Sequence, residues 1–222
     1  MGRVQITTEA GPAEAELDGD RGAARFLFVL THGAGGTTGV PDLLAARDAA
    51  LEMGGLVARV TQPYRVRGAR APGSPVRQDA AWAEVVTALR ELAPGVPLVQ
   101  GGRSNGARVA CRTAAAVGAR AVVALAFPLC PPRRTAATSR AAELHAAREG
   151  GARVLGVNGD RDPFGIPDAR DADRVVVVPG ETHALRGHRA VIVAAVAEWL
   201  PAVLWPTARP RGKAGVRRGS SA

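Results

Sequence analysis

The sequence predicts one α/β domain, in which a mainly parallel sheet of about six strands carries helices on both faces. Short apolar runs alternate with amphipathic stretches from about residue 25 to residue 200, and this alternation is typical of parallel sheets. The chain has 222 residues, of which 46% are hydrophobic, and that length suits a single compact domain.

The domain is expected to begin with a buried strand over 25–30, where the run RFLFVL is almost wholly apolar. A helix is expected over 41–53, because Pro41 suits a first helical turn and Gly54-Gly55 suits a helix end. The strand and the helix together make the first unit of the alternating pattern.

The later elements follow from the same two patterns. The run LVARVT over 56–61 predicts a second strand, and 79–92 predicts a helix whose apolar residues share one face. Further strands are expected at 97–100, 121–127, 154–157 and 174–178, and further helices at 105–117, 138–149 and 188–200.

Three regions are expected along the chain. Residues 1–24 form an N-terminal edge segment that adds a short hairpin to the sheet, and residues 25–205 form the α/β domain. Residues 206–222 are rich in Pro, Gly, Ser and Arg without apolar periodicity, so we expect a disordered basic tail there.

The net charge of +9 raises the question of an acidic partner. Five of the basic residues lie in the last fourteen positions without an acidic residue, and the others are arginines scattered through the fold. We therefore interpret the charge as a solvated surface with a basic tail, and expect neither a nucleic-acid nor a membrane partner.

The remaining composition points to a cytoplasmic protein without a metal. The N-terminus lacks the apolar segment of a signal peptide, and no apolar run approaches the length of a membrane span. The two cysteines, Cys111 and Cys130, lack the spacing of a zinc site or a disulfide framework.

The strongest chemical signal is the segment Gly102-Arg103-Ser104-Asn105-Gly106, which matches G-x-S-x-G, the sharp turn that presents a nucleophilic serine. An apolar strand, VPLVQ, leads into it, and an Ala-rich helix leads out. Small residues two positions before and after the serine prevent clashes with the neighbouring strand and helix. The alternative is a Gly-rich turn with an incidental serine.

A second signal is the segment THGAGG at 31–36, directly after the first core strand. A tight glycine turn there exposes backbone N–H groups, so we expect Gly33 or Ala34 to form half of an oxyanion hole and Asn105 the other half. His32 is interpreted as holding this loop. A phosphate-binding loop is the rival interpretation, but neither G-x-G-x-x-G nor G-x-x-x-x-G-K-[ST] is present.

An acid and a histidine follow two later strands. Asp160 and Asp162 both come after the strand at 154–157, and spacing alone does not separate them as partners of a histidine. His183 follows the strand at 174–178, at the strand end where active sites of open α/β sheets gather. The alternative for His183 is an ordinary surface histidine.

These motifs resemble the small α/β-hydrolases related to dienelactone hydrolase, over roughly residues 25–200. The serine, the acid and the histidine follow one another in the order of that superfamily. The family's acid follows a glycine by three positions and often precedes proline, which matches Gly159, Asp162 and Pro163. The resemblance therefore implies Asp162 rather than Asp160.

The resemblance implies a minimal α/β-hydrolase fold with a catalytic triad of Ser104, Asp162 and His183. Ser104 stands where dienelactone hydrolase itself has Cys, and this is compatible with ester hydrolysis. The gap between 127 and 154 has room for one helix and a Pro-rich turn, so no lid domain is expected and the site should be open.

Arginines follow the strand at 56–61 and should emerge at the same edge of the sheet as the serine. Guanidinium groups bind carboxylates and phosphates in bidentate fashion. We therefore predict that Arg65, Arg67 and Arg70 select small anionic acyl substrates. The alternative is that they are solvated loop arginines.

The sequence thus predicts a serine hydrolase of the carboxylic ester hydrolase type, which cleaves an ester or related acyl bond of a small molecule through an acyl-enzyme. No metal and no organic cofactor is expected. Two alternatives stay open, namely a non-catalytic interaction module of the same fold and transfer of the acyl group to an acceptor other than water. The sequence does not decide the substrate or the oligomeric state.

Overall fold

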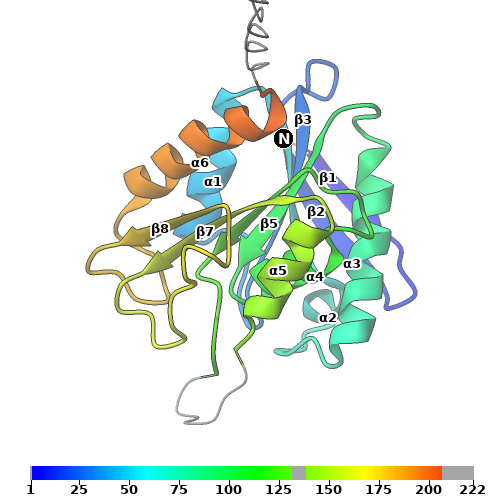
Figure 1. The fold of residues 1–222 in the computed structure, drawn as a ribbon. Helices are drawn as coiled ribbons and strands as arrows, with labels where there is room; N and C mark the ends of the chain where they lie inside the picture. The colour runs from blue at the N-terminus through cyan, green and yellow to red at the C-terminus, as the bar shows by residue number, and fades with distance from the viewer. Residues whose placement is uncertain (1, 132–138, 207–222) are drawn as a thin grey trace, which may run out of the picture.

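The computed structural model describes residues 2–131 and 139–206, which form one eight-stranded sheet with helices on both faces (Figure 1). The predicted α/β fold is confirmed, and the strands from β3 to β8 run parallel. The strands are β1 Gly2–Ile6, β2 Ala13–Asp18, β3 Phe26–Thr31, β4 Gly55–Thr61, β5 Leu98–Arg103, β6 Ala121–Leu125, β7 Arg153–Gly159 and β8 Arg174–Val178.

The order of the strands, β1-β2-β4-β3-β5-β6-β7-β8, places β3 near the middle of the sheet. From β3 the chain first adds β4 on one side and then returns to add β5 on the other. The connections after β3 and β5 therefore both start at the carboxyl ends of their strands and run in opposite directions along the sheet. Crevices for ligands form at such a switch in strand order.

Two layers of helices bury the apolar strands, which explains why β3 and β6 are buried at every position. One face of the sheet packs against two helices, and the other packs against three (Figure 1). The first layer is α1 Pro41–Glu52 and α6 Arg189–Leu204, and the second is α3 Pro75–Arg90, α4 Asn105–Thr113 and α5 Ala141–Glu149.

Four local details differ from the sequence-based expectations. The helix expected from residue 79 begins one turn earlier, at Pro75, because proline suits the first helical position. A short helix, α2 Pro63–Val66, follows β4 and was not expected. The strand β5 runs through two glycines as far as Arg103, and α4 ends at Thr113.

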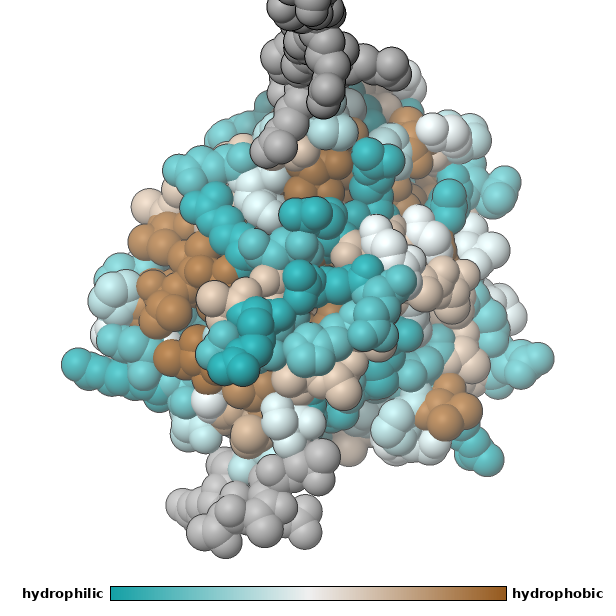
Figure 2. Space-filling model, in the orientation of Figure 1, coloured by the Kyte–Doolittle hydropathy of each residue, from teal (hydrophilic) through white to brown (hydrophobic). Residues whose placement is uncertain are grey.

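The two edges of the sheet differ. At one edge, β1 pairs with β2, and β2 pairs antiparallel with β4. At the other edge lies β8, where Val177 is 43% exposed, and Figure 2 shows apolar residues gathered on the side where β8 and α6 lie in Figure 1. The tail expected at 207–222 lies outside the described residues.

Between β6 and β7, the described residues 126–131 and 139–152 contain α5 and no additional lid helix. Among the described residues, no helix inserted between these two strands covers the site at the switch point.

We expect Phe28→Ala to lower the free energy of unfolding by about 3–5 kcal/mol, because this fully buried ring lies on β3 within the apolar core. Chemical denaturation measures the change. The exposed edge substitution Val177→Thr serves as the control and should alter stability by less than about 0.5 kcal/mol. Similar losses for both variants would contradict this placement of the core.

Candidate active site

Ser104 lies on a strained turn between β5 and α4. Its backbone angles, φ 52° and ψ −115°, lie in a region that non-glycine residues rarely adopt. A Cβ at Gly102 or Gly106 would lie 2.6 Å or 2.5 Å from the carbonyl oxygen of Thr31. The two glycines are therefore required by the close approach of the turn to β3. This close approach presents the serine at the carboxyl end of the parallel strands.

A chain of hydrogen bonds joins Ser104, His183 and Asp162. The Oγ of Ser104 lies 2.9 Å from Nε2 of His183, and Nδ1 of His183 lies 2.9 Å from Oδ2 of Asp162. A carboxylate only accepts hydrogen bonds, so Nδ1 carries the proton and Nε2 accepts from the hydroxyl. The three predicted residues, from three different strand ends, therefore have the mutual geometry of a nucleophile, a base and an orienting acid.

The structure separates the two aspartates that follow β7. The side chain of Asp162 is fully buried, and its Oδ1 accepts a hydrogen bond of 2.9 Å from the N–H of Phe164. Asn158, also buried, donates to Oδ2 of Asp162 at 3.3 Å. Asp160 is exposed. Of the two, Asp162 is the one that is hydrogen-bonded to His183.

The ring of Phe164 packs against His183, with centroids 4.4 Å apart and a tilt of 40°. The histidine side chain is 20% exposed, so its ring is held from one side by Phe164 and by Asp162 while remaining open to a ligand.

The glycine loop after β3 is held by His32, which is fully buried. Nε2 of His32 accepts from the backbone N–H of Gln62 at 3.1 Å, so Nδ1 carries the proton and donates to the carbonyl of Gly33 at 2.8 Å. Burial lowers the pKa of His32, which keeps the ring neutral. In a trans peptide the N–H points opposite to the C=O, so the N–H of Ala34 is directed away from His32.

Two residues of α2 support the same loop from outside. The hydroxyl of Tyr64 donates to the carbonyl of Ala34 at 2.9 Å, and burial raises the pKa of Tyr64 to about 12. Nε of Arg65 donates to the carbonyl of Gly36 at 3.3 Å. A Cβ at Gly33 would lie 3.3 Å from Cβ of Ser104, so this braced loop borders the serine, as does Asn105 on the other side.

The three arginines of the predicted cationic rim differ in their contacts. Arg65 donates to main-chain carbonyls of Gly36 and Ala69, and Arg67 donates to the carbonyl of Ala10. Arg70 is exposed, and its guanidinium has no hydrogen bond within the described residues. The contacts of Arg65 and Arg67 are structural, and selection of anionic substrates by these arginines stays a prediction.

Sequence reasoning missed the role of Arg103, the residue before the serine. Its Nε donates to the fully buried carboxylate of Asp42 at 2.8 Å, and its Nη2 donates to the backbone carbonyl of His183 at 2.5 Å. Burial raises the pKa of Asp42, and the adjacent guanidinium opposes that rise. The Arg103 guanidinium thus ties the loop of His183 to the strand that leads to Ser104, while its ion pair with Asp42 holds it against α1.

Nothing in the described part of the chain suggests a metal or a membrane span. No cluster of three or more His, Cys, Asp or Glu side chains there could hold a metal ion. No described helix is both long and apolar enough to cross a bilayer.

Comparisons with known proteins agree with the fold. The profile of a protein family described as "Alpha/beta hydrolase domain" matches residues 24–179. A comparison with curated protein sequences finds no significant match.

Several solved structures share the fold. An α/β serine hydrolase without a lid from Xanthomonas campestris is 21% identical, with a TM-score of 0.67 over 90% of this chain and 95% of that one. Est1E from Butyrivibrio proteoclasticus is 17% identical, with a TM-score of 0.69 over 90% and 98%. Dienelactone hydrolase from Anabaena variabilis is 16% identical, with a TM-score of 0.69 over 91% and 97%. At such identities the likeness supports the fold alone.

We expect His32 to make the stability of the protein depend on pH. Its pKa is lowered in the folded state, so the unfolded chain binds more protons, and stability falls as pH drops below the ordinary value of 6.5. His32→Asn keeps a donor for Gly33 but cannot titrate. Between about pH 7.5 and about pH 5 the melting temperature of this variant should fall less than that of the wild type. Equal slopes would contradict a buried neutral His32.

Proposed function

The chain belongs to the α/β-hydrolase family, and we propose that it is a serine hydrolase that cleaves an ester or related acyl bond of a small molecule. The observation that carries the proposal is the unbroken hydrogen-bonded chain from Ser104 through His183 to Asp162. A non-catalytic scaffold would not need a strained serine, a histidine held in one tautomer and a buried carboxylate hydrogen-bonded in one chain.

In the proposed reaction, Nε2 of His183 takes the proton of Ser104 as Oγ attacks the acyl carbon. Asp162 accepts the hydrogen bond from Nδ1 throughout and stabilises the imidazolium that forms. His183 then gives its proton to the leaving group, which departs and leaves the acyl group on Ser104. Water, deprotonated by the same histidine, hydrolyses that acyl-enzyme and restores the serine.

The negatively charged oxygen of each tetrahedral intermediate needs hydrogen-bond donors, which form the oxyanion hole. We propose the N–H of Asn105 together with the N–H of Ala34 or Gly33. Asn105 opens α4, so its N–H is one of the unpaired donors at a helix start. The loop after β3 is held by His32 and Tyr64, so its donors are fixed before the substrate arrives.

For the substrate, the proposal reaches only a chemical class. A structure of Est1E holds ferulic acid, a small aromatic carboxylic acid, and we propose a small acyl substrate here as well. Arg70 is the member of the predicted arginine rim whose side chain is available to such a ligand. The reaction as written uses no metal and no organic cofactor.

Ser104→Ala should lower the rate of aryl ester hydrolysis by about 10³-fold or more, because the nucleophile and its base act as one unit. A panel of aryl esters with graded acyl length provides the assay, and circular dichroism checks that the fold is retained. Full activity in the variant would refute the proposal, and an inactive wild type across the panel would favour the non-catalytic module.

Asp162→Asn should reduce kcat far more than Asp160→Asn, because only Asp162 contacts His183. An amide at position 162 can donate to Nδ1 and so favours the wrong tautomer of the histidine, which costs about 10⁴-fold in a Ser-His-Asp enzyme. Asp160→Asn is the matched control, since it makes the same change two residues away. The reverse ranking would show that Asp160 is the orienting acid.

A further inference from the structure

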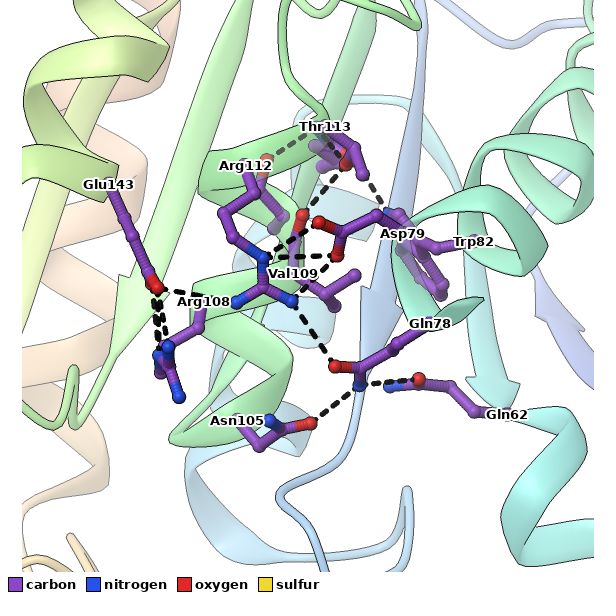
Figure 3. A network of polar contacts seen from close by, with 12 residues as sticks. Gln62, Gln78, Asp79, Trp82, Asn105, Arg108, Val109, Arg112, Thr113 and Glu143 are labelled. Carbon is purple, nitrogen blue, oxygen red and sulfur yellow. Dashed lines mark hydrogen bonds and ion pairs between the residues drawn. The ribbon is translucent and has the colours of Figure 1, made fainter. Parts of the chain in front are cut away.

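Gln78, in the first turn of α3, lies at the centre of a buried polar network beside the candidate oxyanion hole (Figure 3). Its side chain is almost fully buried. Its amide group makes three hydrogen bonds, which use both of its N–H donors and its oxygen. Two of the three lead to the first and last turns of α4, and the third leads to Gln62, just before α2.

One N–H bond reaches the residue after the serine. Nε2 of Gln78 donates to Oδ1 of Asn105 at 2.6 Å. The side chain of Asn105 is thereby tied to α3, although Asn105 itself is the first residue of α4 and follows the strained Ser104. A bond to this side chain restrains the direction of the backbone N–H that the proposed mechanism uses.

The other N–H bond reaches Gln62, which lies between β4 and α2. Nε2 of Gln78 also donates to Oε1 of Gln62 at 2.9 Å. Gln62 in turn donates through its side chain to Oγ1 of Thr31, and through its backbone to Nε2 of His32. His32 holds the carbonyl of Gly33, so this branch ends at the second oxyanion donor.

The orientation of the Gln78 amide is set by the ion pair between Arg112 and Asp79. Nη2 of Arg112 donates to Oε1 of Gln78 at 3.2 Å, and the same guanidinium binds both oxygens of Asp79 at 2.6 to 3.1 Å. Glu143, on α5, accepts hydrogen bonds from Arg112 and from Arg108, which also lies on α4 (Figure 3). Because Arg112 supplies only donors, the oxygen of Gln78 must face it and the NH₂ group must face Asn105 and Gln62.

We propose that Gln78 is a positioning residue that sets the separation of the two oxyanion donors, on Asn105 and on the Gly33–Ala34 loop. It touches neither the substrate nor the reacting atoms, and it acts by joining the two halves of the site through one amide. A misplaced donor loses its contact with the developing oxyanion but leaves the ground-state ester bound as before. This inference rests on the proposed serine hydrolase function.

The test compares Gln78→Met with Gln100→Met. Methionine keeps the length of glutamine but donates no hydrogen bond. Gln100 is a matched control, because it is also buried and also joins α3 to α4, through Trp82 and the carbonyl of Ala110, yet within the described residues it has no hydrogen bond to Asn105 or Gln62. Both variants should lose stability, so a merely structural role would affect both alike.

Three quantities are measured for each variant: kcat and KM for an aryl ester, and the Kd of an aryl trifluoromethyl ketone. Addition of Oγ of Ser104 to this ketone forms a C–O bond, moves the proton to His183 and leaves an oxyanion. For Gln78→Met, kcat and ketone affinity should fall by the same factor, about 10-fold to 100-fold, with KM nearly constant. For Gln100→Met, all three should stay within about threefold of the wild type.

Asn105→Ala supplies an independent route, because it removes the acceptor while keeping the backbone N–H. It should lower kcat and ketone affinity as Gln78→Met does, and the double variant should be no worse than the worse single one.

An unchanged kcat in Gln78→Met or in Asn105→Ala, or equal losses in Gln78→Met and Gln100→Met, would overturn the inference and leave the hydrolase proposal intact. A wild type that neither hydrolyses esters nor binds the ketone would instead refute the hydrolase proposal.

Discussion

The close approach of the serine turn to β3 is the constraint on which the rest of the structure depends. Gly102 and Gly106 pack directly against the backbone of Thr31, and between them Ser104 adopts a backbone conformation that costs on the order of 1–3 kcal/mol. The strands around it, fully buried and apolar, over-determine that turn. The same approach brings Gly33 close to Ser104, which Asn105 directly follows in the chain.

Polar side chains hold the loops around Ser104, which lie outside the apolar core. His32 braces the glycine loop, Arg103 ties the loop of His183 to β5, and Gln78 joins the two sides of the serine. Each of these groups is wholly or largely buried, and no buried side-chain nitrogen or oxygen in the described chain lacks a hydrogen-bond partner. A buried network that is fully satisfied favours one arrangement of the loops over others.

Features of the fold and of the candidate site could be predicted from the sequence where the residues that define them lie close together along the chain. The fold and the positions of Ser104 and His183 were readable, because each motif is local and directly follows an apolar strand. Asp160 and Asp162 were not separable from spacing, since both follow β7; in the structure Asp162 is the one that is buried and contacts His183. Arg103 and Gln78 were missed because their partners lie 61 and 27 positions away, and no local pattern records such contacts.

The central claim is that Ser104 is the nucleophile of the protein. Treatment of the wild type with a fluorophosphonate, followed by intact-mass measurement and peptide mapping, tests it most directly. The account predicts one phosphonyl adduct per chain, on the peptide that contains Ser104, and slower formation of it in Asp162→Asn. An adduct on another residue, or no adduct on the folded protein, would contradict the account.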